Sequence, residues 1–222
     1  YEYQFFNKKM KINILISKNS WANSYKSEIK KALKKFSKTI IFNNNHKKTK
    51  KNTDVNIIFS YFRKMERKYL NYSKFNIIPH ESKLPSGKGM SPLSWQLLEN
   101  KNVIFFSLIE AASSFDSGRI YLQKKVIVPK SILFKEIKKL QLYTNLELII
   151  KFLTKLKKNK TVNGIKQKGK STFYRKRSVK DSLINIDKSI KSQFNLLRIC
   201  DPDNYPAYFK YKNRTYLIKI FS

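Results

Sequence analysis

Short apolar runs alternate with amphipathic stretches along the first half of the chain. The apolar runs are typical of buried strands and cover residues 11–17, 39–43, 55–61 and 74–80. Residues 26–37 place apolar side chains at helical spacing with lysines opposite, and residues 62–70 predict a shorter helix. Residues 43–54 read as a polar loop, with His46 as a solvated loop residue. This alternation predicts an α/β fold, an open and mainly parallel sheet flanked by helices.

The second half adds two strands and then becomes more helical. A serine and a proline open a predicted helix over residues 91–101. Strands at residues 103–111 and 118–129 bracket a loop that carries Asp116. The sheet is therefore expected to gain two more members before the long helix that follows.

The last third of the chain predicts one long helix and a small C-terminal unit. Residues 131–158 are amphipathic, with an interruption expected near Tyr143–Thr144. Residues 159–177 are irregular and charged, as in a linker or a wrap-around loop. A helix over residues 186–200 and a hairpin turning at residues 212–214 complete the pattern.

Composition indicates a packed chain in a reducing environment. Hydrophobic residues make up 41% of the 222 residues, which suits a globular core. No apolar run approaches eighteen residues, so we expect no membrane span. The single cysteine, Cys200, excludes an internal disulfide and favours a cytoplasmic location.

The formal net charge of +34 favours an anionic partner, and nucleic acid is one candidate. Lysine accounts for 41 of the 48 basic residues and arginine for seven. Proteins that read phosphates and bases prefer the planar guanidinium of arginine. The lysines also accompany abundant Asn and Ile, as an AT-rich coding sequence produces. Nucleic acid is therefore not the favoured partner.

The candidate chemistry lies where strands end. His80 closes one predicted strand, Ser60–Phe62 follow the preceding one, and Asp116 lies on a later loop. A His and an Asp that meet in a cleft can transfer protons near neutral pH, although a lone His can also simply fill a turn. No nucleophile motif and no metal-ligand cluster accompanies them. Such a pair suits a substrate that brings its own nucleophile, such as an amine attacking an activated acyl group.

A set of motifs carries a resemblance to a known family. The matching residues, in order, are His80, Ser82, Leu84–Pro85, Gly89, Pro92 and Asp116–Gly118. In this order and spacing the chain resembles the folate-dependent formyltransferases, well over residues 10–130 and more loosely over residues 174–198. The resemblance implies a formyltransferase-like, Rossmann-type domain over residues 10–177. Residues 178–222 then form a helix-and-hairpin extension, and residues 1–9 an N-terminal extension.

The resemblance also implies roles for individual residues. His80 and Asp116 match the catalytic His and Asp, and the donor is N10-formyltetrahydrofolate. The family's catalytic Asn stands two residues before the His, where this chain has Ile78; Asn76, four before, is the candidate replacement. The implied folate-binding residues are Ser60, Tyr61, Phe62, Leu84, Glu110 and Ala111. The implied acceptor-binding residues are Ser82, Lys88 and Gly89.

The acceptor is expected to be the amine of a nucleotide-linked amino sugar, as in lipopolysaccharide biosynthesis. Methionyl-tRNA enzymes of the family carry a C-terminal β-barrel for which the residues after 130 leave no room. Glycinamide ribonucleotide enzymes use a Gly- and Ser-rich phosphate loop, whereas this chain has SKNSWANSY at residues 17–25. Three alternatives stay open: a catalytically impaired basic binding protein, a methionyl-tRNA formyltransferase-like enzyme and a formyl-folate hydrolase. The protein is also expected to be able to form a homodimer.

Overall fold

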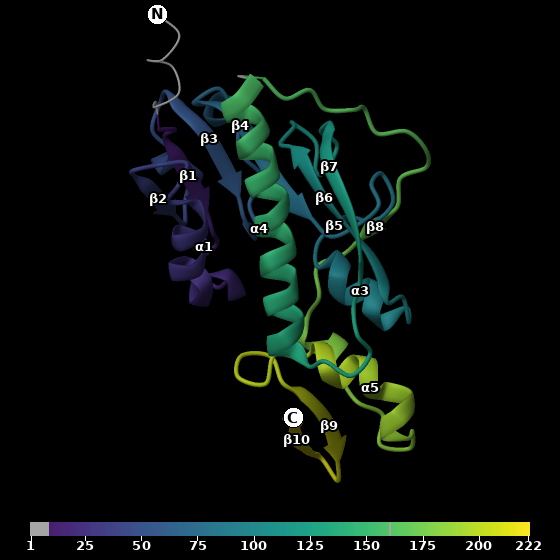
Figure 1. Cartoon of the computed structure of the whole chain (residues 1–222). Coiled ribbons are helices and arrows are strands. Elements are labelled where there is room, and N and C mark those ends of the chain that lie inside the picture. Colours follow the sequence, from purple (N-terminus) through teal and green to yellow (C-terminus); the bar gives the residue numbers. More distant parts are fainter. Residues whose placement is uncertain (1–8, 160) are drawn as a thin grey trace, which may run out of the picture.

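A six-stranded sheet forms the centre of the protein (Figure 1). The computed structural model describes residues 9–159 and 161–222, so the predicted extension at residues 1–9 lies outside it except for Lys9. The sheet order is β2–β1–β3–β4–β6–β7. Its strands are β1 (Ile12–Leu15), β2 (Ile40–Asn43), β3 (Thr53–Ile58), β4 (Ser73–His80), β6 (Val103–Glu110) and β7 (Ile120–Ile127).

The first four of these strands are parallel, and the last two join antiparallel at one side. This arrangement confirms the predicted α/β class with a mainly parallel sheet. The described residues form five α-helices: α1 (Lys26–Leu33), α2 (Arg67–Leu70), α3 (Pro92–Leu98), α4 (Phe134–Asn159) and α5 (Ile190–Ile199). Short 3-10 turns occupy η2 (Trp21–Tyr25), η3 (His46–Lys48) and η4 (Val179–Ser182).

One face of the sheet is apolar and is covered by α1 and α4 (Figure 1). Alternate residues of each strand point to this face because side chains alternate along a strand. Ile14, Ile57 and Ile77 supply fully buried side chains from three neighbouring strands, and Leu33 and Phe152 supply them from the two helices. This packing holds the strands in place, so their carboxyl ends meet at one edge.

The opposite face carries a row of buried asparagines. Asn13, Asn56 and Asn76 lie in register on β1, β3 and β4. Asn43 donates to Asn13 at 2.6 Å, Asn13 to Asn56 at 2.7 Å, and Asn56 to Asn76 at 2.9 Å. The Asn76 amide then donates to the Leu70 carbonyl at 2.8 Å. Every buried amide in this row has a partner, as buried polar groups require.

Helix boundaries differ from the sequence patterns in two places near the N-terminal half. The predicted helix at 62–70 is only α2, because Ser60 has a positive φ of 53° and the Phe62 amide bonds to Ser17 Oγ at 2.8 Å. α1 ends at Leu33 rather than at residue 37. There the chain turns, so that the Phe36 carbonyl accepts the Met10 amide at 2.9 Å.

Two further helix predictions need correction. α4 is continuous, so the interruption expected near Tyr143–Thr144 is wrong; Tyr143 is exposed, while the polar Asn145 has a buried partner in Glu81 at 2.8 Å. α5 begins at Ile190 rather than at 186, because the Ser189 side chain accepts the Ser192 amide and caps the helix.

His46 is buried, so the prediction of a solvated loop residue is wrong. Only 6% of it is exposed, and its Nδ1 lies 2.9 Å from the Tyr61 hydroxyl. Its Nε2 lies 3.5 Å from a Glu66 carboxylate oxygen. Lys47 and Lys48 face solvent while Thr49 turns inward with His46, as the three-residue period of a 3-10 turn dictates.

After α4 the chain returns across the molecule to the loops at the carboxyl edge. This return segment (residues 161–174) forms the long arch in Figure 1. Ile165 pairs with Ile120 at the start of β7, and β8 (Phe173–Tyr174) pairs in parallel with β5 (Lys88–Gly89). The stretch at residues 159–177 is thus mostly irregular, as predicted. It also contains β8, a strand that forms only because it pairs with β5, far away in the sequence.

The C-terminal residues form a small cluster of their own. Ile184, Leu197, Cys200 and Ala207 make up its buried part. α5 lies against α3 and α4. The predicted hairpin is confirmed as β9 (Ala207–Tyr211) and β10 (Arg214–Ile218), turning through two residues with positive φ. In the part of the chain that the structure describes, no helix is long and apolar enough to cross a membrane.

The asparagine row makes a stability prediction. Asn56→Ala removes the amide that bridges two buried neighbours and should lower the free energy of unfolding by about 3 kcal/mol, because each stranded polar group keeps its desolvation cost. Urea unfolding followed by circular dichroism measures this change. Asn163→Ala, at an exposed position, is the matched control and should change the free energy little. Equal values for both variants would contradict a stabilising role of the row.

Candidate functional site

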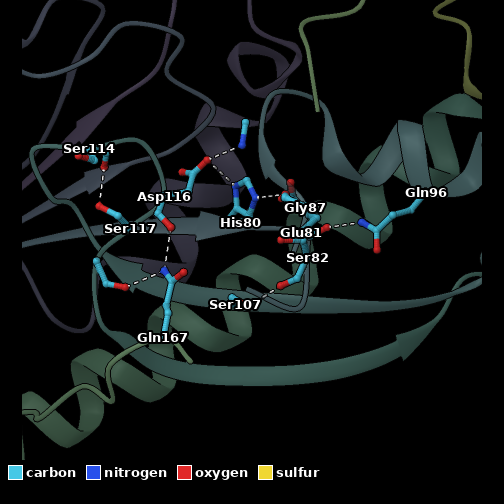
Figure 2. A network of polar contacts seen from close by, with 12 residues as sticks. His80, Glu81, Ser82, Gly87, Gln96, Ser107, Ser114, Asp116, Ser117 and Gln167 are labelled. Atoms are coloured by element: carbon cyan, nitrogen blue, oxygen red, sulfur yellow. Dashed lines mark hydrogen bonds and ion pairs between the residues drawn. The ribbon is translucent and has the colours of Figure 1, made fainter. Parts of the chain in front are cut away.

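His80 ends β4 and begins a tight turn that folds back under its own ring. The turn places the Gly87 carbonyl 2.8 Å from His80 Nε2. A carbonyl oxygen only accepts, so Nε2 carries the proton in this contact. The ring is thereby held in one orientation with Nδ1 pointing the other way (Figure 2).

Asp116 approaches that free nitrogen from the loop between β6 and β7. Its Oδ2 lies 3.7 Å from His80 Nδ1 and accepts the Gly89 amide at 2.8 Å (Figure 2). Asp116 adopts a left-handed backbone with φ of 47°, which aspartate tolerates better than most residues. Sequence reasoning paired His80 with Asp116, and the structure brings the two side chains together.

The pair is nearly shut off from solvent. His80 is 5% exposed and Asp116 is 9% exposed. At 3.7 Å the two groups form an ion pair when Nδ1 is protonated, but they are too far apart for a direct hydrogen bond. Asp116 Oδ1 accepts no hydrogen bond from the described residues. Two atoms of the pair are therefore available for proton transfer. His80 Nδ1 can hold one proton, and Asp116 Oδ1 can accept another.

Two glycines permit the close approaches that build this site. Gly89 has φ of 95°, and a Cβ there would lie 2.2 Å from the Tyr174 carbonyl oxygen. A Cβ on Gly118 would lie 1.9 Å from the Glu110 carbonyl oxygen. Both distances are far below van der Waals contact, so only glycine fits at either position.

The return segment contributes contacts that sequence reasoning missed. Thr172 Oγ1 accepts the Gly87 amide at 2.8 Å, and the Thr172 carbonyl accepts the Lys88 amide at 2.9 Å. The Gln167 side chain donates to the carbonyls of Asp116 and Gly118 (Figure 2). Nothing in the local sequence marks these residues, since their partners lie far away along the chain.

Aromatic and ionic contacts fasten the end of the return segment to α3. The Tyr174 ring stacks on Trp95, and its hydroxyl donates to Glu99 at 2.8 Å. Burial, together with the Glu99 carboxylate, raises the pKa of Tyr174 above its ordinary value. Arg175 pairs with Asp181 through both carboxylate oxygens, and these hydrogen bonds hold the pKa of Asp181 well below its usual range.

Glu81, directly after His80, is a buried carboxylate that the sequence did not single out. Its Oε1 accepts the Asn145 amide at 2.8 Å. Lys138, two turns earlier on α4, has its amine 5.1 Å from the Trp21 ring and 5.4 Å from the Phe134 ring. Burial lowers the pKa of Lys138 to about 8, although Glu81 opposes this shift. Glu81 is therefore a second buried carboxylate in the turn, and it faces α4.

Four of the predicted folate residues, Ser60–Phe62 and Ala111, lie on two loops that meet over one apolar cluster. Tyr61 and Ala111 both pack against a cluster that includes Met65 and lies on the asparagine face of the sheet. Ser60 has a positive φ and accepts a hydrogen bond from the Ser20 hydroxyl at 2.8 Å. The His46 backbone amide donates to the Tyr61 hydroxyl, and His46 Nδ1 contacts the same hydroxyl. The structure thus brings the loop after β3 and the loop after β6 together.

The remaining predicted residues lie in or near the turn. Leu84 and Ser82 are buried, and the Ser82 hydroxyl has no partner among the described residues. Lys88 is also buried, with its amine 5.8 Å from the Phe173 ring. Glu110 is half-buried, and its carbonyl is the group that contacts Gly118.

Asn76 does not join His80. β4 is regular through its full length, so four residues separate the two side chains by about 13 Å. Both ends of the Asn76 amide are already bonded in the asparagine row. Ile78, which occupies the position of the family's Asn, packs in the apolar cluster beneath the two loops. Asn76 is therefore not positioned to act with His80.

Two hollows lie away from the dyad. One of about 400 Å³ lies at the opposite edge of the sheet and includes Lys11 and Ser73 in its lining. Another of about 460 Å³ lies between the start of α4 and the C-terminal residues around Cys200. Among the described residues, no group of three or more His, Cys, Asp or Glu could hold a metal ion.

Comparison with known proteins identifies relatives of this chain. No protein-family model matches the sequence. The chain is 30% identical over 161 residues to the bifunctional polymyxin resistance protein ArnA of Wigglesworthia glossinidia brevipalpis, covering 70% of this chain and 24% of that protein. It is 27% identical over 149 residues to the methionyl-tRNA formyltransferase of Thermosipho melanesiensis, covering 67% of this chain and 48% of that enzyme. The chain thus spans half or less of these relatives' length.

Solved structures share the fold. A methionyl-tRNA formyltransferase from Clostridium thermocellum superposes with a TM-score of 0.76 at 18% identity, covering 95% of this chain and 92% of that chain. HypX from Aquifex aeolicus in complex with tetrahydrofolic acid gives 0.75 at 14% identity, covering 96% and 38%. A sugar N-formyltransferase from a Shewanella species gives 0.67 at 14% identity, covering 94% and 96%. With the motif residues gathered as described, the chain belongs to the folate-dependent formyltransferase family.

Proposed function

We propose that this protein is an N-formyltransferase that uses N10-formyltetrahydrofolate as donor and the amine of a nucleotide-linked amino sugar as acceptor. The buried His80–Asp116 pair is the observation that carries the proposal. We assign the catalytic domain to residues 10–177 and treat residues 178–222 as an extension. The relatives' names support formyl transfer, and the geometry supplies the groups that such a transfer needs.

The donor, when bound, supplies a formyl group attached to a nitrogen leaving group. Transfer forms a bond from the acceptor nitrogen to the formyl carbon and breaks the bond from that carbon to N10. One proton must leave the acceptor amine and one must reach N10. Asp116 Oδ1 takes the first proton, and His80 Nδ1 delivers the second. Gly87 and Gly89 hold the two side chains in place for both transfers.

The two loops beside the dyad suit a flat heteroaromatic ring such as a pterin. Phe62 is 44% exposed on one loop, and Phe115 is 52% exposed next to Asp116 on the other. Large exposed aromatic side chains near a buried polar pair are typical of ligand sites. These residues support folate binding, as does the HypX structure with tetrahydrofolic acid.

The superposition with the Shewanella sugar N-formyltransferase supports the choice of acceptor. It covers 94% of this chain and 96% of that chain. The formal net charge of +34 would also attract a nucleotide diphosphate. A second candidate acceptor is methionyl-tRNA, because several curated relatives are methionyl-tRNA formyltransferases and the same charge suits RNA.

A transfer assay should distinguish these acceptors. Purified protein with N10-formyltetrahydrofolate is expected to formylate at least one of a panel of nucleotide-linked 3-amino and 4-amino sugars, as detected by mass spectrometry. Formylation of methionyl-tRNA alone would overturn the sugar assignment. Release of formate without any acceptor would indicate a hydrolase, and folate binding without turnover would indicate a catalytically impaired relative.

Replacing either member of the dyad should abolish most turnover. His80→Ala and Asp116→Asn are each expected to lower kcat by about 10²–10⁴-fold, because proton transfer in the reaction loses its donor or its acceptor. Asp187→Asn, at an exposed acid, is the matched control and should keep full activity. Circular dichroism verifies the fold. Near-normal kcat in His80→Ala would refute the mechanism.

The exposed phenylalanines should govern donor affinity. Phe62→Ala and Phe115→Ala are each expected to weaken tetrahydrofolate binding about tenfold, since ring stacking contributes roughly 1–3 kcal/mol in comparable sites. Fluorescence or calorimetric titration measures the dissociation constant. Phe221→Ala removes a similarly exposed ring near the C-terminus and is the control. Unchanged affinity in both loop variants would place the donor elsewhere.

A further inference from the structure

Gln167 reaches the Asp116 loop from the return segment. Its Nε2 donates to the Asp116 carbonyl at 2.7 Å and to the Gly118 carbonyl at 2.9 Å (Figure 2). These two carbonyls flank a single residue, Ser117. One side-chain amide therefore clamps the backbone on both sides of Ser117, directly after the turn at Phe115–Asp116.

The orientation of this amide is dictated by its partners. Both contacts are carbonyl oxygens, so a flipped amide would bring its own oxygen against them. In the orientation present, Gln167 Oε1 is buried and has no partner among the described residues. A buried acceptor without a partner disfavours the folded state. The folded protein keeps the Gln167 amide in this orientation although the unpaired oxygen lowers the free energy of unfolding. A stabilising role alone therefore does not explain the two hydrogen bonds that Gln167 donates.

The clamp acts on the backbone that aims the Asp116 carboxylate. Asp116 is in the left-handed region, which a non-glycine residue adopts only when its surroundings hold it there. In this conformation its Oδ2 meets both the Gly89 amide and the side of His80 that carries Nδ1. Any rotation at Asp116 would break one or both contacts.

We propose that Gln167 is a positioning residue for the transfer: its amide holds the Asp116 turn so that the carboxylate faces His80. The inference rests on the proposed function for its kinetic consequences. Gln167 touches neither reacting side chain directly, and it acts through the backbone on either side of Ser117. The return segment is thus part of the catalytic apparatus.

Three variants test the clamp. Gln167→Glu keeps the size but turns a donor into an anion facing two carbonyls, and it should lower kcat about 10²-fold by displacing Asp116. Gln167→Met keeps the length without a donor and should lower kcat about tenfold. Lys168→Gln, at the exposed neighbour, removes one positive charge as Gln167→Glu adds one negative charge, and its kcat should stay within twofold of the parent value.

A spectroscopic readout tests the same point without turnover. The chain has five glycines, so selective ¹⁵N-glycine labelling gives five backbone resonances. The Gly89 amide donates to Asp116, and its resonance should move in Gln167→Glu and Gln167→Met but not in Lys168→Gln. If the parent protein formylates no acceptor, the proposed function fails, whereas the Gly89 resonance still decides the positioning role.

A folded Gln167→Glu with an unmoved Gly89 resonance, or with kcat within twofold of the parent value, would show that Asp116 does not depend on Gln167. A lower melting temperature without a Gly89 shift would indicate a purely structural role and would also refute it. If Gln167→Glu fails to fold, the same criteria applied to Gln167→Met decide the matter.

Discussion

The hydrogen bond from the Gly89 amide to the Asp116 carboxylate is the contact on which the site depends. It joins the turn after β4 to the loop between β6 and β7, and its two residues are 27 positions apart in sequence. The same carboxylate faces His80, so this bond sets the relation of the two titratable groups. Both are almost fully buried, and electrostatic interactions are stronger where water is excluded. Neighbouring segments support this bond through contacts to the backbone near both of its partners.

The return segment provides that support from outside the sheet. It pairs with the turn through β8, holds the Gly87 amide with Thr172 and clamps the Asp116 loop with Gln167. Tyr174 fastens its far end to α3, and the next residue, Arg175, pairs with Asp181 of η4. The return segment, although charged and irregular, therefore supports the site. Its polar groups form hydrogen bonds with the turn after β4 and with the loop between β6 and β7.

Some acidic residues lie at the site, whereas the basic residues lie mostly on the surface. The chain has 48 basic residues and only 14 acidic ones, so each carboxylate is scarce. Glu81, Glu99, Asp116 and Asp181 all lie around the turn and the return segment, each accepting a specific hydrogen bond. The lysines mostly face solvent. Some of the few acidic side chains thus make directional contacts around the site, whereas the basic side chains are mostly on the surface.

The sequence by itself determined the fold class and the order of the strands and helices along the chain, and it proposed the pairing of His80 with Asp116. Apolar periodicity is local, so it showed the strands and the long helix, and turn residues between His80 and Pro92 marked the strand end. Only the tertiary structure decided that His46 is buried, that Asn76 belongs to a row of amides rather than to His80, and that Gln167 braces Asp116. These outcomes depend on contacts between residues far apart in the chain. Local pattern carries no information on which distant backbone group a polar side chain will meet.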